Sequence, residues 1–231
     1  MKLLVDAGNT AVKMMLAHDD DTLGAVSLQE VPWAHVEEVL VSAVADSSAL
    51  TQLLAIAAAN GKTVHRASTS ALWQQLHCAY DNYKTLGIDR WLAVIAGYGE
   101  NPSGYTVVVD AGTALTIDVI NDKHQHLGGY ILSGLKLSEQ SIVNRAQNVF
   151  SVEGLHAQPL PGESTPEAVK NGAFIAALGA IEYVVQHTCK EQAPMLLITG
   201  GDGLSLHMHL PHSTYRPHLV LEGLLRWREG R

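Results

Sequence analysis

The sequence predicts an α/β fold made of two similar halves, and two observations support this. Residues 5–13 read VDAGNTAVK and residues 109–118 read VDAGTALTID, and each copy follows a short apolar run. Segments with the alternation of strands also take turns with segments of helical periodicity along the chain. Such alternation is typical of α/β proteins. An internal duplication of one βββαβ-like unit explains both observations.

The first half contains the expected elements in a simple order. The chain begins with two short apolar strands around a Gly-Asn turn, which is a hairpin signal. A strand centred on VLVSAV follows, and then a helix with Ser47 or Ser48 as its N-cap and Gly61 as its stop. TVHRAS fits another short strand. Residues 88–98 have helical periodicity.

The run GENPSG at 99–104 is the clearest chain breaker, and after it the pattern restarts as strand, turn, strand. We therefore expect two domains, 1–103 and 104–231. The segment HLGGYILSG fits a third strand. The elements expected after it are a helix at 135–148, a loop at 158–166, a long helix at 167–189, a buried strand in MLLIT with a glycine turn, and an amphipathic helix at 219–229.

The charge of the chain limits its partners. The formal net charge is −8, whereas a nucleic-acid binder needs a basic surface that displaces counterions. We therefore expect no nucleic-acid partner. A small phosphorylated ligand is still compatible with an acidic protein, because local amide dipoles and a metal ion can hold it.

The cysteines and the apolar segments indicate a cytoplasmic protein. Two cysteines, Cys78 and Cys189, cannot build a disulfide framework. In the N-terminal MKLLVDAGNT, the charged Asp6 interrupts the apolar stretch that a signal peptide needs, so we expect no signal peptide. The longest apolar helical stretch, 173–189, carries Glu182 and falls short of a bilayer span. We expect no membrane association.

The repeated motif suits phosphate chemistry. Glycine lets the backbone approach a phosphate closely, threonine adds a hydroxyl donor, and aspartate holds a divalent cation, often through water. A single copy would be read as an ordinary Asp-Gly turn. Two copies, together with TGGDG at 199–203 after an apolar strand, favour a phosphate site. Neither a P-loop nor a GxGxxG sequence is present.

Four motifs together resemble a known family. DAGNT, DAGTALTID and ITGGDG resemble the phosphate and adenosine motifs of the acetate and sugar kinase/heat-shock chaperone/actin superfamily. The Tyr-x6-Gly-x-Asp-Arg pattern in YDNYKTLGIDRWLA is similar to the substrate signature of type III pantothenate kinases, a family that includes Bvg accessory factors. GGYILSGLKL, STPEAVKNG and LVLEGL match its later segments. The resemblance implies duplicated ribonuclease-H-like (actin-like ATPase) halves, with mixed β-sheets flanked by helices and a cleft between them.

The resemblance also implies an activity. It is the ATP-dependent phosphorylation of pantothenate to 4′-phosphopantothenate, the first step of coenzyme A synthesis, with Mg²⁺ and a monovalent cation, K⁺ or NH₄⁺. The implied assembly is a homodimer with the substrate pocket at the subunit interface. Two alternatives stay open: a kinase of the same fold acting on another small hydroxylated metabolite, and an ATP-binding regulatory protein without useful turnover. The regulatory alternative would be signalled by loss of a catalytic carboxylate, yet Asp6, Asp89 and Asp110 are all present.

The resemblance implies roles for individual residues. Asp89 would be the catalytic base, Asp6 would bind magnesium through water, and Asp110 would bind the monovalent cation. The residues implied in ATP binding are Asp6, Ala7, Gly8, Asn9, Thr10, Ala11, Val12, Lys13, Thr113, Gly200 and Gly201. The residues implied in pantothenate binding are Tyr80, Gly87, Ile88, Asp89, Arg90 and, from the neighbouring subunit, Thr165.

Two of these residues have competing structural interpretations, and one position departs from the family. Asp89 could instead be the N-cap of a helix beginning near Arg90. Arg90 could hold the pantothenate carboxylate through a bidentate contact or be a solvated side chain in the first helical turn. Ser133-Gly134 stands where the family usually has Pro-Gly, which loosens a rigid turn.

Overall fold

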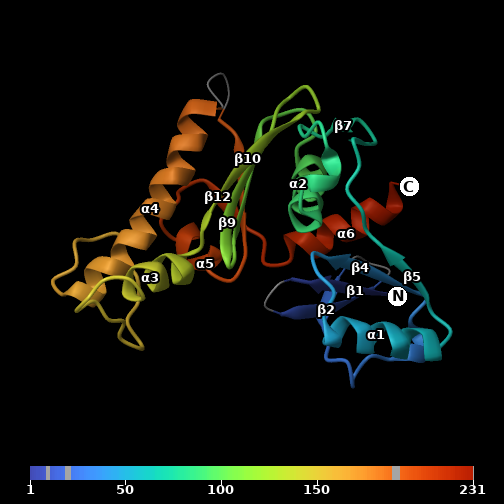
Figure 1. The fold of residues 1–231 in the computed structure, drawn as a ribbon. Helices are drawn as coiled ribbons and strands as arrows, with labels where there is room; N and C mark the ends of the chain where they lie inside the picture. Colours follow the sequence, from blue (N-terminus) through green and yellow to red (C-terminus); the bar gives the residue numbers. More distant parts are fainter. Residues whose placement is uncertain (9–10, 19–21, 189–192, 231) are drawn as a thin grey trace. The chain divides into compact units, whose positions relative to one another are not determined.

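The computed structural model describes residues 1–8, 11–18, 22–188 and 193–230. By its internal contacts the chain divides into two compact units, one formed by Met1–Glu100 with His218–Arg231 and the other by Asn101–Pro217. Each unit contains a five-stranded mixed sheet, and helices pack on the sheet within each unit (Figure 1). The α/β class predicted from the sequence is confirmed.

The first unit is built on a sheet with the strand order β3-β2-β1-β4-β5. β1 pairs antiparallel with β2 and parallel with β4, so the sheet has an antiparallel side and a parallel side. Its elements are β1 Lys2–Ala7, β2 Val12–Ala17, β3 Leu23–Ala25, η1 Trp33–His35, β4 Glu38–Ala43, α1 Ser48–Ala59, β5 Thr63–Arg66, β6 Leu72–Trp73, β7 Leu76–His77, η2 Tyr83–Thr85, α2 Ile88–Glu100 and α6 Leu219–Glu229.

The second unit repeats this topology with the strand order β10-β9-β8-β11-β12. β8 takes the place of β1, because it pairs antiparallel with β9 and parallel with β11. The predicted duplication of the two halves is therefore confirmed. The elements are β8 Thr106–Ala111, β9 Ala114–Ile120, β10 His126–Ser133, α3 Leu135–Val143, α4 Thr165–Thr188, β11 Met195–Thr199, α5 Gly203–His207 and β12 Ser213–Tyr215.

Local sequence signals account for the ends of α1. The Ser47 hydroxyl accepts the backbone N–H of Leu50 at 3.2 Å, so Ser47 is the N-cap of the two candidates. At the other end, Gly61 has a φ of 66°. The N–H of Gly61 donates to Ala58 and that of Lys62 to Ala57, which is a Schellman motif. Gly61 is the predicted stop of the helix.

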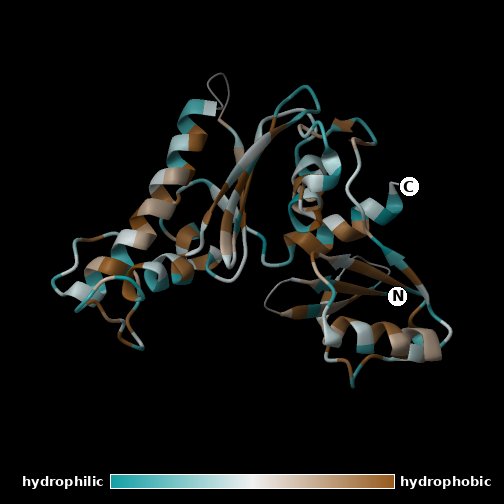
Figure 2. Ribbon diagram, viewed as in Figure 1, coloured by the Kyte–Doolittle hydropathy of each residue, from teal (hydrophilic) through white to brown (hydrophobic). Residues whose placement is uncertain are grey.

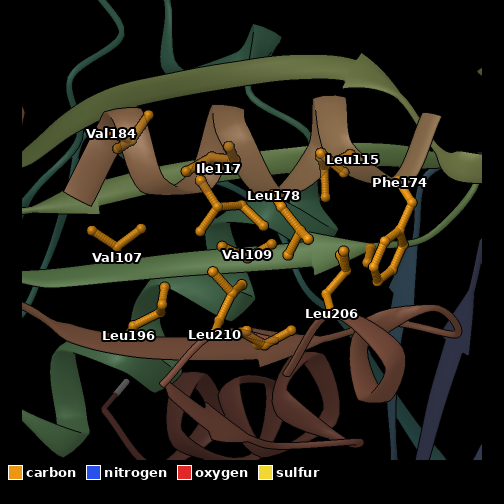
Figure 3. Packing of buried hydrophobic residues seen from close by; sticks show 14 of the residues in the cluster. Val107, Val109, Leu115, Ile117, Phe174, Leu178, Val184, Leu196, Leu206 and Leu210 are labelled. Carbon is orange, nitrogen blue, oxygen red and sulfur yellow. The ribbon is translucent and has the colours of Figure 1, made fainter. Parts of the chain in front are cut away.

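The core of the second unit lies between its sheet and α4. Side chains of β8, β9 and β11 meet Phe174, Leu178 and Val184 of α4, as Figure 3 shows. By length and composition this 24-residue helix could cross a membrane, contrary to the expectation from its apolar stretch alone. Its C-terminal end is nevertheless hydrophilic (Figure 2), and its buried residues belong to the core that includes the strands of this sheet. It is therefore a core helix of this unit.

The C-terminal helix α6 packs closely against α2 in the first unit. A Cβ added to Gly223 would lie 1.9 Å from the carbonyl oxygen of Leu92, so only glycine allows this approach of the two backbones. The Arg226 guanidinium also donates to Glu100 Oε1 at 2.7 Å. Through these contacts the last residues of the chain support the helix that carries Asp89.

Some boundaries differ from those predicted. The helix expected at 135–148 ends at Val143, because the polar residues after it supply no apolar face, and Asn148 has a positive φ. The long helix begins at Thr165, two residues earlier than expected. The short elements β3, α5 and β12 were not predicted, since segments of three to five residues are too short for periodicity to identify.

Candidate active site

Asp6 lies at the carboxyl end of β1, the central strand of the first sheet. Lys13 is its partner on β2, and Ser42 is its partner on β4. Burial raises the pKa of the Asp6 carboxyl and the charge of Asp89 raises it further, whereas the Ser42 hydroxyl and Lys13 lower that pKa. Burial and a neighbouring carboxylate both destabilise the charged form of Asp6. A bound cation would stabilise that charged form.

Gly8 and Ala11, the described residues at either side of positions 9–10, are joined by one backbone hydrogen bond. The backbone N–H of Gly8 donates to the carbonyl of Ala11 at 3.0 Å. Gly8, Ala11 and Val12 line one side of a cavity of about 380 Å³. Ala7, the last residue of β1, is buried. The predicted ATP contacts of Asn9 and Thr10 lie outside the described residues.

Asp89 lies in the first turn of α2, one residue after the helix begins at Ile88. Its Oδ1 accepts the backbone N–H of Arg90 at 2.8 Å. Its Oδ2 has no hydrogen-bond partner within the described ranges of the chain. A Cβ on Gly87 would lie 2.6 Å from Asp89 Oδ1, so glycine is the residue that leaves room for this carboxylate.

Arg90 and Tyr80 form a second group beside Asp89. Arg90 is only 7% exposed, and its Nη1 donates to the hydroxyl of Tyr80 at 3.1 Å. The guanidinium also lies 5.9 Å from the centre of the Tyr80 ring. A buried guanidinium requires polar partners. Arg90 is therefore not the solvated side chain that the sequence left as an alternative.

A cavity of about 580 Å³ borders this segment at the carboxyl ends of β4 and β5. Gly87 and Ile88 form part of its wall. The polar residues that line it are Ser68, Thr69, Tyr83, Lys84 and Thr85. Ligands of sheets with parallel strands commonly bind outside the carboxyl ends of those strands.

Asp110 occupies the equivalent position in the second unit, at the carboxyl end of β8. Gly200 has a φ of 92°, and a Cβ there would lie 2.5 Å from both Asp110 Oδ1 and the Ala111 carbonyl. The turn after β11 is therefore packed directly against the second motif. Gly201 and Thr113 are exposed beside it.

Gly134 packs against the second motif, at Gly112 and Thr113. The N–H of Gly134 donates to the Thr113 carbonyl at 3.0 Å, and a Cβ on Gly134 would lie 2.2 Å from the carbonyl oxygen of Gly112. The Ser133 and Ser138 hydroxyls are 2.7 Å apart and hydrogen-bonded. This bond joins Ser133 to Ser138 of α3.

Asp202 is a feature of this region that the sequence interpretation missed. Burial raises the pKa of its carboxyl, and its backbone N–H donates to the Ala111 carbonyl at 3.0 Å. It lies on a cavity of about 560 Å³ whose lining includes Lys136, Phe174 and Ser205. Its position directly after the double glycine of ITGGDG is the sequence signal that could have identified it.

Thr165 is the first residue of α4 and is exposed. Just before the helix, the N–H groups of Glu163 and Ser164 donate to the Glu167 carboxylate at 2.9 Å and 3.1 Å. As the first helical residue, Thr165 follows the N-cap position and does not cap its own helix.

The structure groups the described candidate residues into one set in each unit. The first unit brings Asp6, Lys13 and Asp89 close enough for their charges to interact. No cluster of three or more His, Cys, Asp or Glu side chains suited to a metal occurs in the described part of the chain. Asp6 and Asp89 together fit magnesium, because this ion takes one or two carboxylates and keeps several waters.

Comparison with known proteins agrees with this geometry. The sequence profile of the family described as type III pantothenate kinase matches residues 2–187. A type III pantothenate kinase from Pseudoalteromonas translucida is 39% identical over 229 residues, covering 99% of this chain and 97% of that protein. Another from Alkalilimnicola ehrlichii is 33% identical, covering 96% and 95%.

Solved structures support the fold. A Campylobacter jejuni protein described as a Baf family transcriptional activator superposes with a TM-score of 0.60 at 24% identity, covering 98% of this chain and 97% of that one. At this level of identity the likeness concerns the fold alone.

The raised pKa of Asp6 predicts how an Asp6→Asn variant behaves without ligands. A carboxyl whose folded-state pKa is raised contributes stability below its unfolded pKa and loses it as the pH rises through the folded pKa. The variant should therefore melt a few degrees higher than the wild type at pH 7, and the gain should shrink towards pH 4. Thermal unfolding across this pH range measures it.

Asp81→Asn is the matched control, because Asp81 is exposed and the charge change is the same. It should leave the melting temperature almost unchanged at every pH. A melting temperature for Asp6→Asn that is lower than that of the wild type throughout would contradict the assigned burial of this carboxylate.

Proposed function

The chain belongs to the type III pantothenate kinase family and phosphorylates pantothenate at the expense of ATP, and from this premise we propose how its residues carry out the reaction. The product is 4′-phosphopantothenate, and the reaction is the first step of coenzyme A synthesis. The observation that carries the proposal is the proximity of the Asp6 and Asp89 carboxylates in one unit, with the Tyr80–Arg90 pair beside Asp89.

Asp89 acts as the catalytic base in this proposal. Its Oδ1 is held by the Arg90 N–H, which leaves Oδ2 to accept the proton of the pantothenate primary hydroxyl. An alcohol is far too weakly acidic to lose this proton beforehand. The carboxylate therefore orients the hydroxyl oxygen early and accepts its proton late, as the bond to the γ-phosphorus forms.

Tyr80 and Arg90 recognise the substrate. Pantothenate carries a carboxylate, and a guanidinium can bind a carboxylate through two parallel hydrogen bonds. The contact with Tyr80 fixes the Arg90 side chain in one orientation before the substrate arrives. Gly87 and Ile88 supply the adjoining wall of the substrate site.

The remaining predicted residues serve ATP and its cations. Lys13 and the turn 7–12 contact the phosphates, and Asp6 holds magnesium through water. Magnesium, when bound, offsets the charge that develops on the transferred phosphoryl group. Thr113 contacts the nucleotide, while Gly200 and Gly201 line its adenosine part beside the cavity that contains Asp202.

Asp110 contributes to the monovalent cation site. Its carboxylate lies beside Gly112 and Gly200, and a glycine at each place leaves space around it. Potassium and ammonium both prefer oxygen donors, and a carboxylate next to turn carbonyls provides them. We place the enzyme in the cytoplasm, as expected from its sequence.

We further propose that a homodimer completes the substrate pocket with Thr165. The outward face of α4 carries two large exposed apolar side chains, Ile175 at 52% and Tyr183 at 61%. Between and beside them lie Gly172 and Gly179, where an added Cβ would meet nothing within 4 Å. Small residues flanked by large apolar ones suit close packing against a second copy.

The activity is tested by measuring ADP release. The purified protein should release ADP when ATP, pantothenate, magnesium and potassium are all present, and much less when sodium replaces potassium. Sugars and other hydroxylated metabolites serve as competing acceptors. ADP release that does not depend on pantothenate would refute the assignment of the acceptor.

Replacing Asp89 tests the proposed base. Asp89→Asn should lower turnover by roughly 10²-fold or more, the scale of a lost general base, while pantothenate still binds. Asp81→Asn, an exposed residue of the same charge, is the control and should keep wild-type turnover. Near-normal turnover in Asp89→Asn would leave this carboxylate with only a structural role at the start of α2.

A charge on the outward face of α4 tests the dimer. Ile175→Arg should convert the dimer to monomers in sedimentation velocity and raise the KM for pantothenate, because Thr165 of the neighbouring subunit would be lost from the pocket. Val64→Arg places the same charge on the exposed β5 strand and should change neither property. A wild-type chain that sediments as a monomer would exclude this arrangement.

A further inference from the structure

Ser42 is a buried polar residue with no assigned role in the reaction. It lies on β4 in the run EVLVSA, where the preceding Val39, Leu40 and Val41 are all buried. Ser42 itself is 0% exposed. A hydroxyl that is removed from water without a partner costs folding free energy. Its presence in an apolar strand therefore calls for a partner.

The sheet register identifies that partner. Ser42 pairs with Asp6 across the parallel β1–β4 ladder, and paired residues project their side chains to the same face of a sheet. The Ser42 hydroxyl is close enough to lower the pKa of the Asp6 carboxyl. However, it makes no hydrogen bond of regular geometry with any residue that the structure describes. A rotation of one of the two side chains is needed to complete the bond.

The second unit repeats this arrangement. Thr199, which is 3% exposed, pairs with Asp110 across the parallel β8–β11 ladder. Both motif aspartates thus have a buried hydroxyl residue at the same position of the neighbouring parallel strand. The flanking sequences, VLVSA and LLITG, differ at most positions, so the shared feature is the hydroxyl opposite the carboxylate.

We propose that Ser42 is a positioning residue for the kinase reaction, whose hydroxyl donates to the Asp6 carboxylate and holds it in the orientation that the ATP site requires. Ser42 does not contact pantothenate in this proposal. It acts through Asp6, as groups behind a ligating carboxylate commonly do. The proposal rests on the proposed role of Asp6, and its first test is therefore made on the protein without nucleotide, metal or substrate.

The first test is a double-mutant cycle in thermal unfolding at pH 7. Ser42→Ala should lower the melting temperature of the wild type, and it should lower that of Asp6→Asn by about 3 °C less, because a hydrogen bond to a carboxylate is stronger than one to an amide. Thr106→Val removes an equally buried hydroxyl from the other unit and should give the same shift in both backgrounds. Equal shifts for Ser42→Ala would overturn the proposal.

The second test separates positioning from packing by steady-state kinetics. Ser42→Ala and Ser42→Cys should each lower kcat/KM for ATP about tenfold, the scale of a lost supporting contact, with the KM for pantothenate unchanged. Ser42→Thr retains the hydroxyl and should recover most of this loss, although its extra methyl group in a filled core should lower the melting temperature.

The order of activities is the decisive result. The proposal is supported if the wild type and Ser42→Thr are more active than Ser42→Ala and Ser42→Cys, whatever the order of their melting temperatures. Activities that follow melting temperature across the series would overturn the proposal. If the wild type showed no pantothenate-dependent turnover, the proposed function would fail, while the unfolding cycle would still report whether Ser42 and Asp6 interact.

Discussion

The structure depends on one feature of each sheet: its central strand holds a carboxylate in a fixed position near the carboxyl end of that strand. Asp6 and Asp110 each lie near the carboxyl end of a buried apolar strand that is hydrogen-bonded on both sides. A strand held on both sides cannot shift its register without moving its apolar side chains out of the core. The position of each carboxylate is thereby determined by the packing of the sheet behind it.

The same constraint has an energetic cost within the first unit. Asp6 is partly removed from water and lies near Asp89, and both effects raise the pKa of its carboxyl. A fold optimised for stability alone would not bring these two carboxylates together. Their proximity agrees with the proposed reaction, in which one acidic group serves the phosphates and another the attacking hydroxyl. Functional sites commonly carry such local conflicts.

Glycine permits the close contacts that the site needs. Gly87 leaves room for the Asp89 carboxylate, and Gly200 allows the turn after β11 to approach Asp110 and Ala111. Gly223 allows the backbone of α6 to approach that of α2. In each case the glycine matters because any side chain would collide with backbone or with a carboxylate.

The sequence by itself determined the two-half plan, most long elements and the identity of the candidate motifs. Strand alternation, helical periodicity and the Asp-x-Gly turns are local patterns that neighbouring residues are enough to reveal. It could not locate β3, α5 or β12, whose few residues contain too little pattern. The tertiary structure alone decided which distant side chains meet: Ser42 beside Asp6, Tyr80 on a buried Arg90, and α6 on α2. Those relations depend on strand register and on the packing of segments far apart in the chain, and no local pattern records either.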